Sequence, residues 1–223
     1  MTYGSVFSRL RDAAPDWDAY TKHAFVAGLG NGSLPRSRFL HYLAQDYVFL
    51  IHFSRAWALG VVKAETLDEM KTCAATVDGL VNHEMSLHIS ICAEAGIPPD
   101  TLEKTPEAQG NLAYTRYVLE AGFSGDFLDL VAALAPCVMG YGEIGTRLAS
   151  EKSSDVYAPW IATYAGDDYQ GVCNTVGAML DAAVQRRLGP DWMRSPRLDA
   201  LQHRFDTATR LEVGFWDMGL AGA

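Results

Sequence analysis

Residues 36–63 read RSRFLHYLAQDYVFLIHFSRAWALGVVK, and this stretch decides the fold class. Its apolar residues recur at the three- and four-residue spacing of one helix face, without the alternation that marks a strand. The preceding segment, GNGSLP at residues 30–35, has the glycine and proline content of a turn. We therefore expect one long helix over residues 36–63.

The same spacing continues on both sides of this helix, and glycine and proline separate the segments. The other expected helices cover residues 3–13, 16–29, 67–95, 106–121, 126–150, a shorter stretch from Pro159, 168–188 and 197–220. No internal repeat, linker or low-complexity segment interrupts them. The sequence predicts an all-α, single-domain helical bundle over residues 1–223.

Composition narrows the class of protein. A chain of 223 residues that is 49% apolar can bury one sizeable core. Its 27 acidic and 18 basic residues give a net charge of -9, which repels phosphate backbones and anionic lipids. We expect neither a nucleic-acid partner nor a membrane partner.

The start of the chain and the cysteines indicate a compartment. Residues 1–9 lack the basic and apolar regions of a signal peptide, and no uninterrupted apolar stretch of membrane-spanning length stands out. The four cysteines are widely spaced, as is typical of a reducing environment. We expect a cytoplasmic protein.

Cys137 differs from the other cysteines in its surroundings, APCVMGYGE. Pro136 lacks a backbone N–H and is expected to open or kink a helix here, placing the thiol near unpaired amides that favour thiolate. Gly140 and Gly142 would leave open space beside it, and Tyr141 would project from the same face. Cys137 is either a nucleophile or a small buried side chain beside a kink.

Asp46 lies among aromatic and apolar residues of the predicted helix 36–63. A carboxylate is rarely buried without a partner. That partner is either a ligand, such as an aminopyrimidine whose N–H groups it accepts, or a side chain such as Arg55, His52 or one from a neighbouring helix.

Glu212 shares a helix face with Phe215 and Trp216. A carboxyl among aromatic rings tends to have a raised pKa, as a general acid requires. The alternative is an interhelical salt bridge. Similarly, Tyr114, Tyr117 and Tyr164 either contact a planar ligand or belong to the core.

A metal site is the main rival chemistry. The candidate ligands are His83, Glu84, His88, His52, Glu143 and His203. Two-metal helical bundles use a Glu-x-x-His pair from each of two helices, whereas Glu84 and His88 are four residues apart and the spacing has no second copy. We expect no metal, and interpret His83, Glu84 and His88 as buried polar helix contacts.

Several segments, taken together and in order, resemble the TenA (thiaminase II) family. They are FVAGLGNGSLP (25–35), FLHYLAQDYVFLIHFSRA (39–56), HEMSLH (83–88), AYTRYVL (113–119), APCVMGYGEIG (135–145), YAPWIATYAGDDY (157–169) and LEVGFWDM (211–218). Each segment is weak alone, but the set spans nearly the whole chain and is specific.

The resemblance implies a fold similar to haem oxygenase, without haem, metal or other cofactor, in a homotetramer. It implies hydrolysis of 4-amino-5-aminomethyl-2-methylpyrimidine to the hydroxymethyl compound in thiamin salvage, and cleavage of thiamin. By motif position, Cys137 would be the nucleophile and Glu212 the acid that assists amine departure. The implied substrate contacts are Asp46, Tyr141, Tyr164 and Tyr114.

One position departs from the family's pattern. Where a tyrosine is usual three residues after the pocket aspartate, this chain has Phe49. The ring is kept, but the hydroxyl thought to enhance the cysteine's nucleophilicity is lost. Activation would then rely on Tyr114, the helix start or another donor, because Tyr47 points in another direction.

Two other classes of function stay open. One is a catalytically weak pyrimidine-binding or regulatory protein, because family members have been labelled transcriptional regulators. The other is an oxidase on the same scaffold, because a fold alone does not decide its chemistry.

Overall fold

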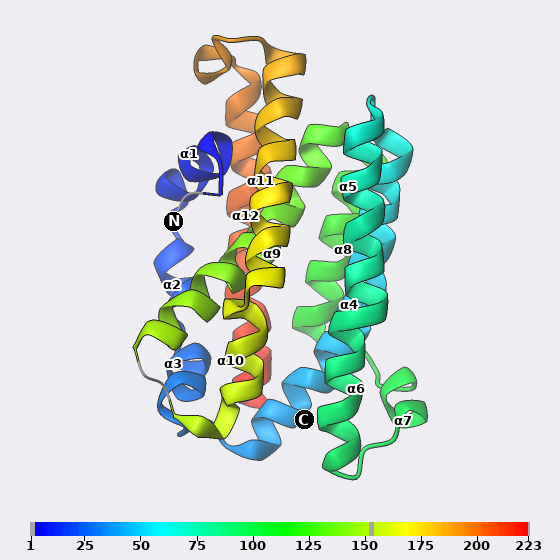
Figure 1. Ribbon diagram of the computed structural model, residues 1–223, viewed down its shortest axis with the longest axis vertical. Helices are drawn as coiled ribbons and strands as arrows, with labels where there is room; N and C mark the ends of the chain where they lie inside the picture. The colour runs from blue at the N-terminus through cyan, green and yellow to red at the C-terminus, as the bar shows by residue number, and fades with distance from the viewer. Residues whose placement is uncertain (1–2, 152–153, 223) are drawn as a thin grey trace.

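The computed structural model describes residues 3–151 and 154–222; the ends of the predicted domain (1–2 and 223) and residues 152–153 lie outside the described residues. Within the described ranges every regular element is helical, which confirms the predicted all-α bundle (Figure 1). The elements are α1 (Ser5–Ala13), α2 (Trp17–Thr21), α3 (Ala24–Asn31), α4 (Arg36–Lys63), α5 (Leu67–Asp78), η1 (Gly79–Glu84), α6 (Met85–Glu94), α7 (Pro99–Glu103), α8 (Gln109–Ser124), α9 (Phe127–Ser150), η2 (Asp155–Tyr157), α10 (Ala158–Ala165), α11 (Asp167–Leu188), η3 (Trp192–Arg194) and α12 (Arg197–Ala221).

Helix α9 forms the core of the bundle. It starts with a capping box, in which the Asp126 side chain accepts from the Asp129 amide and the Asp129 carboxylate accepts from the Asp126 amide. It packs against α8, α10, α11 and α12, and its side chains are buried from Phe127 almost continuously to Leu148. Residues on α9 are therefore held rigidly from several sides.

Helix α9 also corrects an expectation about apolar stretches. By length and composition alone it would be able to cross a membrane, but 83% of its most apolar window is buried inside the structure. That burial accounts for its composition, since a helix covered all round by other helices is apolar all round.

The helices differ from the expected ones in three places. The helix expected over residues 16–29 is divided into α2 and α3, because His23 leaves the helical conformation and its Nδ1 accepts from the Phe25 amide as a cap. The chain after Gly96 forms the short α7, which was not among the expected helices. Helix α8 starts at Gln109 instead of residue 106.

The helix expected over residues 67–95 changes geometry partway. Residues Gly79–Glu84 form a π-helix, η1, between α5 and α6. A Cβ at Gly79 would meet nothing within 4 Å, so the backbone there is not tightly covered. Short π segments within helices often mark functional sites, and this one turns toward the pocket described below.

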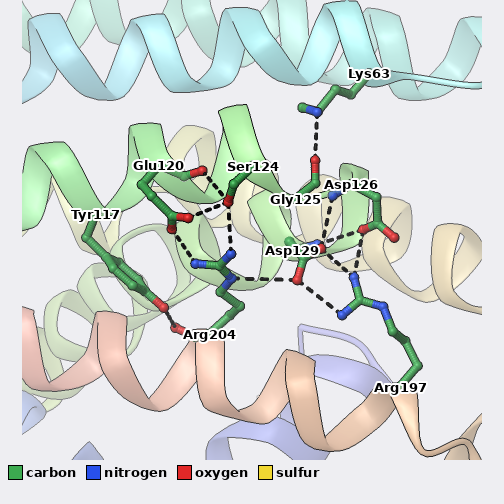
Figure 2. Close-up of polar contacts among 9 residues, drawn as sticks. All are labelled: Lys63, Tyr117, Glu120, Ser124, Gly125, Asp126, Asp129, Arg197 and Arg204. Carbon is green, nitrogen blue, oxygen red and sulfur yellow. Dashed lines mark hydrogen bonds and ion pairs between the residues drawn. The ribbon is translucent and has the colours of Figure 1, made fainter.

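A polar network links four helices, α4, α8, α9 and α12, at the end of the bundle where α9 begins (Figure 2). Arg197 of α12 contacts Asp126 and Asp129, and Arg204 of α12 contacts Glu120 of α8 as well as Asp129. From α4, the Lys63 ammonium donates to the carbonyl oxygen of Gly125 at 2.7 Å. These contacts fix the start of α9 and thereby the position of side chains further along it.

Candidate active site

A pocket of about 780 Å³ opens between α4, η1, α9 and the α10–α11 junction. Its wall brings together four of the sequence-predicted residues, Asp46, Phe49, Cys137 and Tyr141. The other three, Glu212, Tyr114 and Tyr164, are not on that wall. They are buried behind it and bonded to groups close to it, as follows.

Cys137 lies in the middle of α9, about three turns after the helix begins. Pro136 therefore does not open a helix, the first of the two expected alternatives, and the thiol does not lie at a positive helix end, because that field acts only over the first turn. Burial, followed by the nearby Glu212 carboxyl, raises the pKa of the Cys137 thiol well above its usual value. The resting group is a thiol, and deprotonation has to accompany its reaction.

The expected open space beside Cys137 is filled by other side chains. A Cβ at Gly140 would lie 2.3 Å from the Tyr20 ring, and one at Gly142 would lie 2.7 Å from the sulfur of Cys173. The glycines thus allow other elements to approach α9 closely. Tyr141, four residues after the thiol, does share its face as predicted, since both line the pocket.

Asp46 on α4 is nearly fully buried and doubly held. Its Oδ2 accepts from the Tyr42 hydroxyl at 2.9 Å and lies 2.7 Å from Nε2 of His88 on α6. The partner is thus on a neighbouring helix. The nearer candidates face elsewhere, with Arg55 against His52 and His52 near Glu107.

The His88 ring orients Asp46. Its Nδ1 lies 2.8 Å from the Glu84 carbonyl oxygen, which only accepts, so this nitrogen carries a proton. Burial works to lower the pKa of His88, but the contacts with Asp46 outweigh it and the pKa is raised. A protonated ring that donates from both nitrogens fixes the Asp46 carboxylate at the pocket wall.

Glu212 on α12 lies directly behind the thiol. Only 1% of the residue is exposed, and its Oε1 accepts from the Tyr114 hydroxyl at 2.8 Å. Burial raises the pKa of its carboxyl to about 8, and a hydrogen-bonding contact with Cys137 opposes this rise. The expected elevation of the pKa is confirmed, and no Lys or Arg among the described residues forms the alternative salt bridge with Glu212.

Aromatic rings surround the inner end of the pocket. Phe49 packs with its ring centroid 4.9 Å from that of Tyr114 and 5.3 Å from that of Phe215. It presents a ring without a hydroxyl to the pocket. Tyr114 donates to Glu212, so its effect on the thiol passes through that carboxyl. Tyr117 faces away and donates to the Arg204 carbonyl oxygen (Figure 2).

Tyr164 on α10 connects to a residue with no role assigned from the sequence. Its hydroxyl donates to Oε1 of Glu84 at 2.7 Å, and its ring lies 5.0 Å from that of Tyr141. Glu84 is on the pocket wall, and burial raises the pKa of its carboxyl to about 7. Glu84 is therefore a further inward-facing carboxyl at this site besides Asp46 and Glu212, while the exposed Asp167 and Asp168 also line the pocket.

Within the HEMSLH segment, His88 is a buried polar contact as expected, whereas His83 and Glu84 differ from that expectation. His83 is exposed and lines the pocket, and Glu84 is half-buried with its carboxyl turned inward. Within residues 3–151 and 154–222, no three His, Cys, Asp or Glu side chains are grouped to hold a metal ion. Glu143, for example, is engaged by Arg11 and Trp17.

Sequence reasoning missed the roles of Tyr42, Glu84 and His88. The available signal was the four-residue spacing from Glu84 to His88, which was weighed as a metal motif and otherwise interpreted as buried polar helix contacts. The resulting arrangement can hold a flat, hydrogen-bonding heterocycle against Asp46, with a thiol and two further carboxyls at hand.

Comparisons with known proteins identify the family of the chain. The profile of the TENA/THI-4/PQQC family matches residues 10–222. An aminopyrimidine aminohydrolase from Halalkalibacterium halodurans is 37% identical over 214 residues, covering 95% of this chain and 93% of that protein. One from Helicobacter pylori is 30% identical over 211 residues, covering 93% and 94%. A crystal structure from Silicibacter, described as a TenA family transcription regulator, has a TM-score of 0.96 at 62% identity, covering 98% and 97%.

Proposed function

The chain belongs to the TENA/THI-4/PQQC family, and from this premise we propose that it is an aminopyrimidine aminohydrolase of the thiaminase II type. It converts 4-amino-5-aminomethyl-2-methylpyrimidine to the hydroxymethyl compound, and it also cleaves thiamin. The observation that carries the proposal is one pocket with the Cys137 thiol and the Asp46 carboxylate on its wall and the Glu212 carboxyl behind the thiol.

Asp46 holds the substrate. Its carboxylate accepts N–H bonds from the aminopyrimidine, while His88 and Tyr42 keep it in position. Tyr141 contacts the ring from α9, and Tyr164 and Tyr114 support the site from behind its wall. An aromatic-lined pocket with a few fixed polar groups suits a small flat ligand.

In the first half of the reaction the sulfur of Cys137 bonds to an electron-poor ring carbon, and its proton passes to the Glu212 carboxylate. The electrons pushed into the ring then break the bond between the exocyclic methylene and the amine. Glu212 returns the proton to the departing amine. Covalent addition replaces one difficult displacement with easier steps, and Glu212 acts as base and then as acid.

In the second half, water adds to the exocyclic methylene carbon. The electron pair returns through the ring, the carbon–sulfur bond breaks, and the thiol recovers a proton. The atoms balance as aminomethylpyrimidine plus water giving hydroxymethylpyrimidine plus ammonia.

The test is incubation of purified protein with aminomethylpyrimidine and, separately, with thiamin, with ammonia, thiazole and hydroxymethylpyrimidine quantified. We expect turnover of the first substrate, and at least a roughly 100-fold loss in Cys137→Ser. A Cys137→Ser variant as fast as the wild type, or no turnover of either substrate, would refute the proposal. Cys92→Ser, at a buried thiol that does not line the pocket, is the matched control.

A regulatory role is the second candidate, because the Silicibacter relative is described as a transcription regulator. The net charge of -9 opposes direct contact with DNA. A non-catalytic pyrimidine sensor would bind aminomethylpyrimidine tightly and release no ammonia, which the same assay distinguishes.

We also propose that the protein is a cytoplasmic homotetramer. The exposed side chains of Val62 (80% exposed) and Phe123 (73%) support self-association. They lie at adjoining ends of α4 and α8, which the bond from Lys63 to Gly125 holds together. Light scattering of the purified protein measures the state, and a monomer would contradict it.

A further inference from the structure

Three carboxyls that line the pocket have no role in the steps above: the exposed Asp167 and Asp168, and Glu84, whose carboxyl is turned inward. Glu84 lies on the same wall as Asp46 and Cys137, at the last position of the π-helix η1. It is not part of the Cys137–Glu212 pair on α9 and α12. It comes from η1, and its side chain contacts Tyr164 near the end of α10.

The contacts of Glu84 hold it in place but leave it able to accept a proton. Its Oε1 accepts from the Tyr164 hydroxyl at 2.7 Å, and its backbone carbonyl accepts from Nδ1 of His88 at 2.8 Å. Its Oε2 has no hydrogen-bond partner among the described residues, and no Lys or Arg there pairs with it. A carboxyl anchored by one oxygen and free at the other has the geometry of a general base.

Neither Asp46 nor Glu212 is as well placed as Glu84 to activate the water. Asp46 is bonded to Tyr42, His88 and the pyrimidine. Glu212 is a carboxylate again once it has protonated the amine, but it lies behind the pocket wall, bonded to Tyr114, whereas Glu84 lines the pocket. Burial raises the pKa of Glu84 to about 7, close to the value at which a base is effective near neutral pH.

We propose that Glu84 is a further catalytic residue, the general base that deprotonates the water attacking the exocyclic methylene carbon. The oxygen of water bonds to that carbon while its proton moves to Oε2 of Glu84. The returning electron pair breaks the carbon–sulfur bond, and the proton then passes from Glu84 to the released Cys137 sulfur. Tyr164 is a positioning residue that aims Glu84. The inference rests on the proposed function.

The experiment separates amine release from product release in Glu84→Gln, which keeps the shape of the side chain. With excess aminomethylpyrimidine, we expect kcat for hydroxymethylpyrimidine to fall about 100-fold or more. The first turnover should still release one equivalent of ammonia per site at close to the wild-type rate. Intact-mass measurement should then find the pyrimidine-methylene adduct on Cys137.

Azide gives a readout that a merely structural defect would not produce. It is an anionic nucleophile that needs no base, so it should intercept the adduct in Glu84→Gln and restore turnover, giving the azidomethyl product. Glu94→Gln, at an exposed carboxyl on α6, is the control and should behave as the wild type. Equal melting temperatures of the two variants would show that Glu84→Gln is folded.

The role of Glu84 is overturned if Glu84→Gln keeps wild-type kcat, or if it loses ammonia release and product together with no adduct and no response to azide. Failure of the proposed function would look different, because the wild-type protein itself would then release no ammonia.

Discussion

At the scale of single residues, Glu212 opposes ionisation of the buried Cys137 thiol, whereas the hydrogen bond with the thiol favours the Glu212 carboxylate. The pKa of Cys137 is raised well above its usual value by burial and then by Glu212, while burial raises the pKa of Glu212 to about 8. The reactive form carries one negative charge, on Glu212, because only the carboxylate can take the thiol proton. We therefore expect kcat/KM for aminomethylpyrimidine to rise with pH and level off above about 8. A flat profile from pH 6 to 9 would contradict this.

A substitution at Tyr114 tests whether Glu212 is the group whose ionisation causes this rise of kcat/KM with pH, the rising limb of the profile. Its hydroxyl bond to Glu212 stabilises the charged carboxylate and so lowers the pKa of that group. Tyr114→Phe should move the limb of the kcat/KM profile to higher pH. Tyr117→Phe is the matched control, since that hydroxyl bonds the Arg204 carbonyl away from the pocket, and it should leave the limb in place. Identical limbs in all three proteins would exclude Glu212 as the titrating group.

The sequence could predict which residues needed partners but not always which partners they have. An acid among aromatic residues indicated a raised pKa at Glu212. Asp46 was correctly expected to need a partner, yet its partner His88 lies 42 positions away, and helical spacing carries no information about contacts between helices. The state of the Cys137 thiol was predicted wrongly for the same reason, because its burial depends on several other helices.

At the scale of elements, the contact of α9 with α10 is set by Gly145. A Cβ there would lie 2.6 Å from the backbone carbon of Tyr164, and backbone cannot yield as a flexible side chain can. Gly145→Ala should push the end of α10 away, lowering stability by about 1–3 kcal/mol and weakening the Tyr164 contact with Glu84. The measurement is the melting temperature together with kcat.

Gly171 on α11 is the control for that change. Nothing lies within 4 Å of a Cβ added there, so alanine should only improve helix propensity, by up to about 1 kcal/mol. Gly171→Ala is expected to raise the melting temperature and leave kcat unchanged. If Gly145→Ala and Gly171→Ala change the melting temperature and kcat in the same way, Gly145 is not needed for the close approach of α10 to α9.

Most helices could be predicted from spacing, whereas their interruptions could not. Residues 36–63 and the core helix α9 follow the expected pattern closely. The π-helix η1 carries no distinct apolar period, since its six residues continue the pattern of α5 and α6. The break at His23 depends on a side-chain cap, which apolar periodicity does not report.

At the scale of the whole molecule, ion pairs between helices make folding sensitive to acid. Glu69 of α5 contacts Arg186 and Arg187 of α11. Burial acts to raise the pKa of Glu69, but the hydrogen bond from Arg187 and further contacts lower it to about 2. Its folded pKa is below the ordinary 4.5, so its stabilisation is present above pH 4.5 and is lost as pH falls toward 2. Urea midpoints should fall from pH 5 to pH 3, and less steeply in Glu69→Gln.

The active site imposes the opposite dependence on pH. The folded pKa of Glu212 is about 8 and its ordinary value is 4.5, so the unfolded chain loses this proton first. The associated stability is present below pH 4.5 and is lost as pH rises toward 8. Because a difference of one in pKa is worth about 1.4 kcal/mol, the charged carboxylate costs a few kcal/mol. Glu212→Gln should therefore match the wild type in stability at pH 5, exceed it at pH 9, and have lost its activity at both.

Urea unfolding of Glu212→Gln at these two pH values measures that difference, with Glu94→Gln as the control at an exposed carboxyl. If Glu212→Gln is less stable than the wild type at both pH 5 and pH 9, the Glu212 side chain contributes to stability through its packing. A gain confined to high pH would mean that the fold tolerates an unfavourable buried charge on α12. The contacts that offset it lie elsewhere, in pairs such as Glu69 with Arg187, whose stabilisation is fully present above pH 4.5.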